Sequence, residues 1–285
     1  MFQYNIPLKK YNTFKVGGPA DYFCEVKEKQ ELKRAIDFSN SKQLPCFILG
    51  GGSNLLINDN GFKGLVIKLN NSDCKVKDDR IFAQAGVSLT ELVELSAVKG
   101  LSGLEWAAGI PGTLGGAIRG NAGAFGSCMS DFLEIVEVAD ENFSFHSLHK
   151  KDCRFSYRDS LFKHNSQIIF SAILNLKKSD EDLIRQKIEQ NLNHRKERQP
   201  LNYPSAGSFF KNFPEKPAGQ IIEEAGLKGK QIGGAMVSEK HGNFIINFNG
   251  ATASNIKELA ELIKSEVKEK TGYQLEEEIR YLGFD

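Results

Sequence analysis

Residues 204–212, P-S-A-G-S-F-F-K-N, combine side chains that can do chemistry with small residues that admit a ligand. Ser208 can give a proton, while Lys211 and Asn212 can hold a polar substrate through an ammonium group and a side-chain amide. Gly207 and its small neighbours let the backbone approach a ligand closely, because glycine lacks a Cβ atom. The segment therefore predicts a substrate site, and the alternative is a polar turn capped by two core phenylalanines.

Two other segments carry charged groups that could act on a substrate. F-S-Y-R-D-S-L-F at residues 155–162 contains Arg158, whose planar fork of donors fits a carboxylate or an enolate and stays protonated. L-E-E-E-I-R-Y-L-G at residues 275–283 contains Glu276 and Glu278, which a strand places on the same face. Strand alternation therefore leaves the choice between these two glutamates open.

Two glycine-rich loops have the composition of phosphate cradles. The first is G-G-G-S-N at residues 50–54, and the second extends over residues 109–126. Successive glycine amides can point at a pyrophosphate without interference from side chains. The first loop does not match the Rossmann motif G-x-G-x-x-G, because Leu55 occupies the position of the third glycine and no helix pattern follows. A tight turn between strands is the alternative for this loop alone, but two cradles suit a large ligand with two phosphates.

Together with H-R-K-E-R-Q-P-L at residues 194–201, these motifs resemble the UDP-N-acetylenolpyruvoylglucosamine reductase family, in matching order from about Tyr11 to the C-terminus. The resemblance implies an enzyme that reduces UDP-N-acetylglucosamine enolpyruvate to UDP-N-acetylmuramate for peptidoglycan. FAD, bound noncovalently, is the implied cofactor, and NADPH is the implied co-substrate. The implied fold class is α+β, with a two-part FAD-binding domain of the vanillyl-alcohol-oxidase/PCMH type followed by a smaller α/β substrate-binding domain.

The resemblance also assigns residues. Arg158 stabilises charge, Ser208 donates the proton, and Glu278 assists the enolic intermediate, since the family has an acidic residue directly before a β-branched residue and Arg. The implied substrate-binding residues are Tyr157, Lys211, Asn212 and Gln231. The implied FAD-binding residues are Gly50, Gly51, Gly52, Ser53, Asn54, Gly112, Thr113, Gly115, Gly116, Asn121 and Ala122. Neither loop contains His or Cys where a covalent flavin link is usual, and no metal site is expected.

Two departures from the family pattern are visible. The connection between Arg158 and the strand at Gln167 is short, without the extra segment and substrate-covering tyrosine of the larger branch, so the chain resembles the shorter, type II branch. Phe213 separates Asn212 from Pro214, where the family has Asn-Pro directly. This second departure affects the loop shape rather than the chemistry.

Composition narrows the class of protein. The 285 residues are 40% hydrophobic and 26% charged, and the net charge of +1 provides no broad field for nucleic acid or an anionic membrane. No apolar run spans a membrane and no signal peptide is recognisable, so we expect a cytoplasmic protein. The five cysteines lack a C-x-x-C pair, which argues against disulfides and zinc. No motif sets the oligomeric state, and a monomer is expected.

The pattern of apolar and turn residues predicts the order of elements. Helices are expected at residues 28–42, 88–99, 179–198, 217–225 and 255–270. Strands are expected at residues 46–49, 63–69, 74–77, 80–85, 132–139, 167–176, 231–237, 243–248 and 274–282. The expected organisation is a first FAD-binding subdomain at 1–70, joined by a C-terminal strand at about 274–285, a second at 71–200, and a substrate-binding domain at 201–273.

Two other functions are compatible with parts of this pattern. An alcohol or aldehyde oxidase on the same flavin fold needs the glycine loops but not Arg158, Ser208 and Glu278. The second is a non-enzymatic module that binds flavin or a nucleotide sugar. Bleaching of a bound flavin by pyridine nucleotide, followed by recovery of colour with the enolpyruvyl sugar, separates the three.

Overall fold

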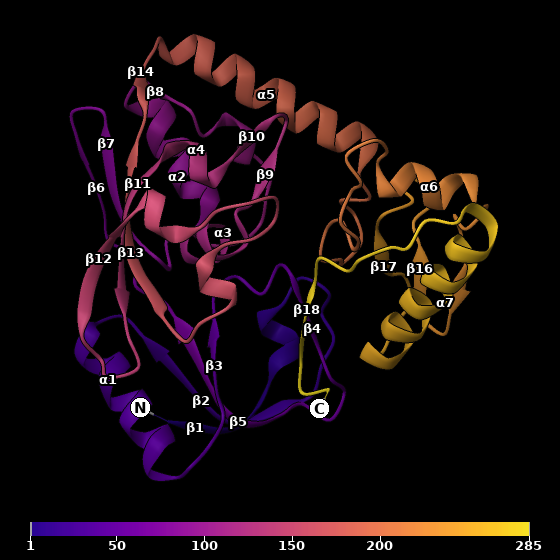
Figure 1. The fold of residues 1–285 in the computed structure, drawn as a ribbon, viewed down its shortest axis with the longest axis horizontal. Coiled ribbons are helices and arrows are strands. Elements are labelled where there is room, and N and C mark those ends of the chain that lie inside the picture. Colours follow the sequence, from indigo (N-terminus) through magenta and orange to yellow (C-terminus); the bar gives the residue numbers. More distant parts are fainter. Residues whose placement is uncertain (1, 285) are drawn as a thin grey trace. The chain divides into compact units, whose positions relative to one another are not determined.

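The computed structural model describes residues 2–284, which divide into two compact units (Figure 1). Unit 1 contains residues 24–51 and 67–194. Unit 2 contains residues 2–23, 52–66 and the chain from 195 onward. The helices are α1 Lys29–Ser41, α2 Leu89–Val98, α3 Leu114–Gly120, α4 Met129–Phe132, α5 Glu181–Arg198, α6 Ala218–Glu224 and α7 Ala253–Thr271.

The strands are short and mostly antiparallel. In the first half of the chain they are β1 Gln3–Pro7, β2 Pro19–Val26, β3 Cys46–Leu49, β4 Leu55–Ile57, β5 Phe62–Leu69, β6 Cys74–Lys77, β7 Arg80–Gln84, β8 Leu101–Ser102, β9 Gly123–Ala124, β10 Ser127–Cys128 and β11 Leu133–Ala139. In the second half they are β12 Phe145–His149, β13 Ile168–Asn175, β14 Lys177–Lys178, β15 Gln231–Ile232, β16 Ala235–Val237, β17 Ile245–Asn247 and β18 Arg280–Leu282.

Unit 1 is built on a five-stranded antiparallel sheet of order β12-β11-β13-β7-β6. Val136 pairs with Ala172, which pairs with Ala83, and all three are almost fully buried, so this row lies on the core face of the sheet. The helices start where the sequence supplies caps. The side chain of Ser88 accepts a hydrogen bond from the Glu91 amide, and Glu91 returns one, which closes a capping box at the start of α2.

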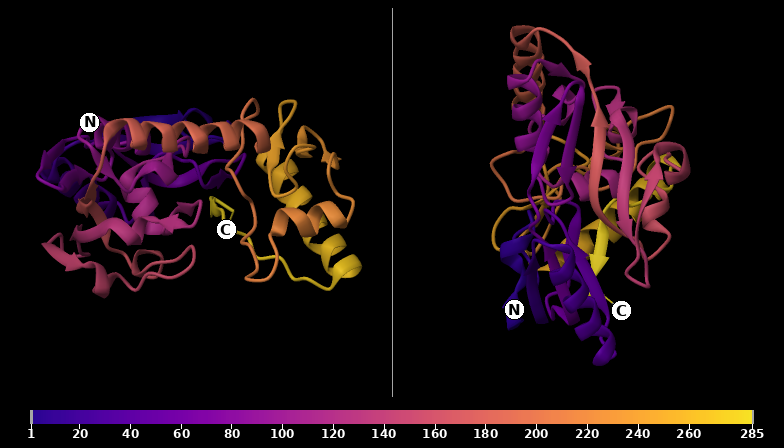
Figure 2. Two further views of the ribbon diagram at one scale, coloured as in Figure 1. Left: turned by 90° about the horizontal axis from the view of Figure 1, so that it is seen from above. Right: turned by 90° about the vertical axis from the view of Figure 1, so that its left-hand side faces the viewer.

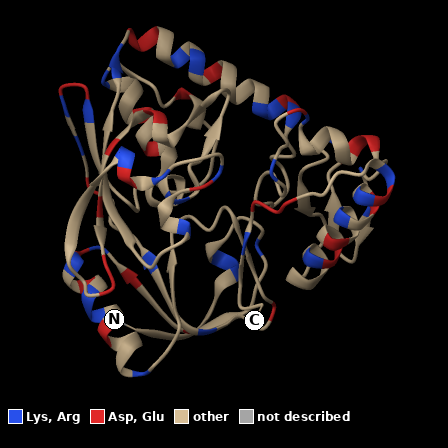
Figure 3. Ribbon diagram, in the orientation of Figure 1, with Lys and Arg blue, Asp and Glu red and all other residues tan. Residues whose placement is uncertain are grey.

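A second sheet has the order β1-β2-β5-β3. The division between the two units falls within its strands β2 and β5. The same division falls within α5, which Figure 2 shows as one uninterrupted helix. Acidic residues begin α5 and basic residues end it, as its colours in Figure 3 show. This order of charges complements the helix dipole.

Unit 2 buries one face of α7 against a small meander of order β15-β16-β17. Its core includes Ile256, Leu259, Ile263 and Val267, which recur at helical spacing on α7 as the sequence predicts. The C-terminal strand β18 pairs in parallel with β4, the strand that follows the first glycine loop, with Arg280 opposite Leu55. The chain end therefore returns beside a segment far earlier in the sequence.

Most predicted helices and strands are confirmed within two residues of their ends, but three predictions are wrong in part. The run 231–237 is two strands rather than one, because Gly233 has φ +53° and turns the chain between them. The run 274–282 forms a strand only from residue 280. The spacing of Leu183, Ile184, Ile188 and Leu192 predicts one apolar stripe along α5, but Ile184 is buried while Leu183 and Leu192 are exposed.

The sequence patterns also missed β1, β2 and the short helix α3 inside the second glycine loop. Glycine-rich sequence has low helix propensity, so tertiary contacts override it at α3. Within residues 2–284, every helix is too short or too polar to cross a bilayer.

Candidate active site

The two glycine-rich loops lie against each other within unit 1. A Cβ atom added to Gly51 would stand 2.6 Å from Gly112 Cα, and one added to Gly50 would stand 2.7 Å from Thr113 Oγ1. Side chains at Gly50 and Gly51 would therefore collide with the other loop. The structure thus brings together residues from both predicted cradles.

Two polar groups at this junction suit a phosphate-bearing cofactor. Thr113 is only 7% exposed, and its Oγ1 atom has no hydrogen-bond partner among the described residues. A buried hydroxyl without a partner costs free energy unless a ligand satisfies it. Lys68 Nζ donates to the Gly50 carbonyl at 2.7 Å, and burial lowers the pKa of this lysine. A hydroxyl, a lysine and glycine backbone fit the pyrophosphate of FAD.

Lys68 was missed by the sequence analysis. Its only signal is a charged residue inside the otherwise apolar run L-V-I-K-L of β5. A lysine in such a run is expensive to bury and needs a partner, which the strand pattern does not identify.

The remaining residues of the first loop lie in unit 2. Gly52 adopts φ +64°, a conformation that favours glycine, and Ser53 follows it half-buried. Asn54 has a role that the sequence did not indicate. Its Nδ2 atom donates to the Glu278 carbonyl at 3.0 Å, and its carbonyl accepts from the Arg280 amide at 3.0 Å. The first glycine loop therefore holds the backbone that carries Glu278.

Residues of the second loop form hydrogen bonds within the loop and with neighbouring segments of unit 1. The Gly115 amide donates to the Ala85 carbonyl at 2.9 Å, and Gly116 lies on the first turn of α3. Asn121 ends α3 in the left-handed conformation, with φ +42°. Its side chain donates to the Ser156 carbonyl and accepts from the Ser130 amide, at 2.9 and 3.1 Å. Ala122 also bonds through its backbone, so these residues shape the loop.

Arg158 lies on a strained turn that the Asn121 side chain helps to hold. The backbones of Ser156 and Asp159 exchange hydrogen bonds of 3.1 and 3.2 Å, and between them Arg158 has φ +56°. A left-handed conformation is unfavourable for a residue with a side chain, and such strain concentrates at functional sites. Lys163 Nζ donates to the Arg158 carbonyl at 2.6 Å, and the guanidinium carbon lies 5.4 Å from the Tyr157 ring centre. Arg158 and Tyr157 thus belong together in unit 1.

Ser208 and Glu278 belong together in unit 2. Ser208 is half-buried directly before Phe209 and Phe210, whose rings are in the core. The Glu278 amide donates to the Phe209 carbonyl at 2.8 Å, and the Lys211 amide donates to the Glu276 carbonyl at 2.8 Å. The segment that carries Ser208 is therefore tied to the segment that carries both glutamates.

The structure distinguishes the two glutamates that alternation left open. Glu276 is exposed and its carboxylate forms an ion pair with Lys211. Glu278 is half-buried, one backbone hydrogen bond from the residue that follows Ser208. Its placement suits a group that works beside Ser208.

The other predicted substrate residues have partners of their own within unit 2. Asn212 Oδ1 accepts from the Ala218 amide at 3.0 Å, at the first turn of α6. Gln231 Nε2 donates to Met236 Sδ at 3.0 Å across the β15-β16 hairpin. Burial lowers the pKa of His241, whose Nδ1 accepts from a backbone amide at 3.2 Å. A structural role for His241 agrees with these contacts.

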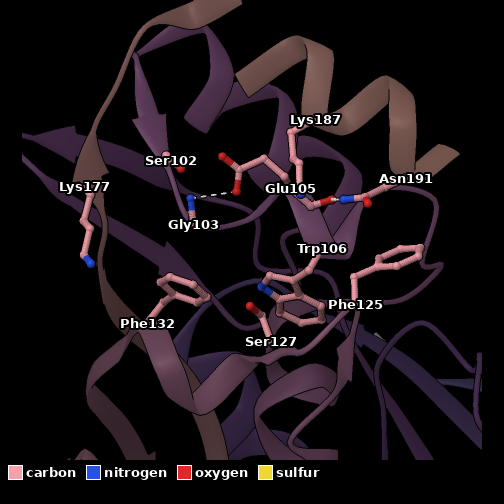
Figure 4. A pocket seen from close by; sticks show the side chains of 10 residues that line it. All are labelled: Ser102, Gly103, Glu105, Trp106, Phe125, Ser127, Phe132, Lys177, Lys187 and Asn191. Atoms are coloured by element: carbon pink, nitrogen blue, oxygen red, sulfur yellow. Dashed lines mark hydrogen bonds between the residues drawn. The ribbon is translucent and has the colours of Figure 1, made fainter. Parts of the chain in front are cut away.

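Figure 4 shows a separate pocket of about 270 Å³ within unit 1. The rings of Trp106, Phe125 and Phe132 and the side chains of Lys177 and Lys187 lie around it. None of the residues assigned from the sequence lines this pocket. Phe125 and Ser127 of the β9-β10 hairpin line it, and it is therefore not part of the constellation described above.

Comparison with known proteins yields matches over the whole chain. A family model described as UDP-N-acetylenolpyruvoylglucosamine reductase, C-terminal domain, matches residues 199–282, and one described as FAD binding domain matches residues 20–145. The UDP-N-acetylenolpyruvoylglucosamine reductase of Caldanaerobacter subterraneus is 45% identical over 98% of this chain and 93% of its own length. That of Syntrophomonas wolfei is 41% identical, over 98% and 94%.

Solved structures agree. The UDP-N-acetylenolpyruvylglucosamine reductase of Thermus caldophilus is 37% identical and superposes with a TM-score of 0.86 over 99% of this chain and 100% of its own. The 6-hydroxy-D-nicotine oxidase of Arthrobacter nicotinovorans is 14% identical, with a TM-score of 0.50 over 62% of this chain and 42% of its own. The second likeness shows a shared fold alone.

Proposed function

The chain belongs to the UDP-N-acetylenolpyruvoylglucosamine reductase family, and on this premise we propose which residue carries out each part of the reaction. It is a FAD-dependent oxidoreductase that reduces UDP-N-acetylglucosamine enolpyruvate to UDP-N-acetylmuramate with NADPH, in peptidoglycan synthesis. The chemistry that FAD supplies when bound is hydride transfer from NADPH to the alkene. The oxidase alternative is wrong, since full-length relatives are reductases and the oxidase likeness covers 62% of the chain.

Ser208 is the proposed proton donor. Addition of hydride to the terminal alkene carbon leaves an enolate beside the substrate carboxylate, and the adjacent carbon then needs a proton. The observation that carries this proposal is the 2.8 Å hydrogen bond from the Glu278 amide to the Phe209 carbonyl, which places the carboxylate-bearing segment beside Ser208. A serine hydroxyl is a weak acid, so it depends on a strongly basic enolate and on charged neighbours. Glu278 and Lys211 are those neighbours.

Arg158 stabilises the charge that develops on the substrate. Its guanidinium can donate two parallel hydrogen bonds to a carboxylate or enolate and cannot itself act as an acid. The strained backbone at φ +56° supports this role, because such a conformation is retained where the side chain must point in a set direction. We assign substrate binding to Tyr157, Lys211, Asn212 and Gln231. Asn212 would combine this contact with its bond to α6.

The FAD pyrophosphate is assigned to the junction of the two glycine loops. Gly50, Gly51 and Gly112 would admit the cofactor through their backbone, and Thr113 Oγ1 would donate to it. The other residues that we assign to FAD binding are Gly52, Ser53, Asn54, Gly115, Gly116, Asn121 and Ala122.

We also propose the organisation and setting of the enzyme. Two FAD-binding subdomains, at 1–70 with the C-terminal strand and at 71–200, precede a substrate-binding domain at 201–273. The family-model boundary at residue 199 supports the start of the third part. The enzyme acts as a cytoplasmic monomer on a UDP-sugar and NADPH, without nucleic acid or membrane.

Rapid-mixing absorbance of Ser208→Ala tests the central assignment. Flavin bleaching by NADPH should keep its wild-type rate, because that step takes no proton from Ser208. Reoxidation by the enolpyruvyl sugar should slow by about 10²- to 10⁴-fold, the contribution of a positioned general acid. Ser205→Ala removes a hydroxyl from the same segment and should change both rates less than about twofold. Equal slowing of both half-reactions by Ser208→Ala would make Ser208 a ligand-positioning group.

A further inference from the structure

Asn243 forms a two-point clamp on the backbone of Phe210. Its side chain is 1% exposed, its Nδ2 atom donates to the Phe210 carbonyl at 2.8 Å, and its Oδ1 atom accepts from the Phe210 amide at 2.9 Å. The carbonyl of Asn243 also accepts from the Phe209 amide at 2.8 Å. The Asn243 side-chain amide offers one donor and one acceptor, as a peptide group does. It therefore forms the two hydrogen bonds to the Phe210 backbone that a neighbouring strand would otherwise form.

The opposite edge of the same segment is held by the chain near Glu278. The Phe209 carbonyl accepts from the Glu278 amide, and the Lys211 amide donates to the Glu276 carbonyl, both at 2.8 Å. The segment 209–211 is therefore held by Asn243 on one side and by residues 276–278 on the other, and Ser208 directly precedes it. Buried backbone groups with such short partners have little freedom to rotate.

The clamp is itself anchored. The Asn243 amide donates to His241 Nδ1 at 3.2 Å, and Phe209 and Phe210 are 0% and 1% exposed within the core of unit 2. Any shift of Asn243 must therefore move the backbone of Phe210 rather than be absorbed by loose packing.

We propose that Asn243 is a positioning residue for the second half-reaction, acting through the Phe210 backbone to aim the Ser208 hydroxyl and the Lys211 ammonium at the substrate. This inference rests on the proposed role of Ser208. Asn243 touches no reacting atom. Its contribution is to hold a proton donor in place, which matters because displacement by about 1 Å can cost about 10²-fold in rate.

Asn243→Asp keeps the size of the side chain but replaces the Nδ2 donor with an oxygen facing the Phe210 carbonyl. Rapid mixing should show normal FAD content, normal bleaching by NADPH and reoxidation by the enolpyruvyl sugar slowed by about 10- to 100-fold. Asn247→Asp is the matched control, since Asn247 also donates to a carbonyl, that of Phe14, at 3.0 Å and accepts from the Ala251 amide at 2.8 Å. Asn247→Asp should lower thermal stability about as much as Asn243→Asp does, but it should not selectively slow reoxidation.

Combination with Ser208→Ala separates this inference from the role of Ser208. Once the hydroxyl is absent, Asn243→Asp should slow reoxidation by less than about threefold further, because coupled residues are not additive. Slow reoxidation in Ser208→Ala together with wild-type reoxidation in folded Asn243→Asp would overturn the inference and leave the role of Ser208 intact. Normal reoxidation in Ser208→Ala would overturn both.

Three further results would count against the clamp. They are equal slowing of both half-reactions in Asn243→Asp, equal selective slowing in Asn247→Asp, and full additivity of the double variant. If Asn243→Asp does not fold, Asn243→Ser replaces it, since the smaller side chain leaves room for water at the Phe210 carbonyl. The same selective slowing is expected from Asn243→Ser, and wild-type reoxidation in that variant would equally overturn the inference.

Discussion

At the scale of single residues, left-handed backbone conformations occur both inside and outside the proposed active site. Arg158 and Asp78 both have φ +56°, but only Arg158 belongs to the proposed active site. Asp78 belongs to the turn between β6 and β7, where Asp tolerates the left-handed region. The two positions therefore form a natural pair for separating strain from function.

Arg158→Gly should lower turnover while leaving the free energy of unfolding nearly unchanged. Glycine relieves the left-handed strain but adds entropy to the unfolded chain, so the free energy of unfolding should stay within about 1 kcal/mol of wild type. Turnover should fall at least about tenfold, the scale of one lost charge-assisted hydrogen bond. Steady-state kinetics and urea unfolding measure the two effects. Asp78→Gly should match the stability result and keep full turnover, and an active Arg158→Gly would place Arg158 outside the site.

At the scale of elements, separated segments of unit 2 cap and fix one another. The carboxylate of Asp59, which follows β4, accepts from the amides of Ala253 and Ser254 at 2.8 and 3.0 Å. Thr252 caps the same helix through the Asn255 amide. The first turn of α7 thus depends on a side chain almost 200 residues away, which no local pattern reveals.

Asp59→Asn should lower the free energy of unfolding by about 1 kcal/mol, because it removes a negative charge and an acceptor from a helix N-terminus. The urea midpoint is the measurement. Glu258→Gln removes the same charge from within α7, away from its first turn, and should change stability by less than about 0.5 kcal/mol. Equal effects of the two substitutions would show that net charge, rather than the cap, determines the loss.

At the scale of the whole molecule, buried thiols should set part of the alkaline limit of stability. Cys24 and Cys153 are fully buried, and burial raises the pKa of each from 9.0 to about 11. Between these values the unfolded chain loses thiol protons that the folded chain keeps, so the free energy of unfolding falls as pH rises. Below about pH 8 the thiols stay protonated in both states, so they add little to the slope.

Chemical unfolding between pH 8 and 10.5 checks this expectation. The midpoint of wild type should fall with pH, and the fall should be shallower in a Cys24→Ala/Cys153→Ala variant, even if that variant is less stable throughout. Lysine ion pairs titrate equally in both proteins, so the difference in slope isolates the thiols. Parallel curves would show that these thiols titrate alike in the folded and unfolded chains.

The sequence by itself determined the family, most of the helices and strands, and which residue types are available for chemistry. Capping boxes, turn residues and periodic apolar positions act over a few neighbours, so Ser88 with Glu91 predicted the start of α2 without knowledge of the fold. The motif around Ser208 likewise predicted a substrate site from the types of its residues. These signals are local, and a single chain is enough to show them.

Only the tertiary structure decided which residues lie close together within each unit. Glu278 rather than Glu276 lies half-buried beside the Ser208 segment, and the residues that hold this arrangement, Asn54 and Asn243, come from distant parts of the chain. The bond from Lys68 to the Gly50 carbonyl and the left-handed conformation of Arg158 were likewise not predicted from the sequence. The physical reason is that a side-chain amide or ammonium satisfies whichever backbone group folding brings to it, and sequence spacing carries no information about that partner.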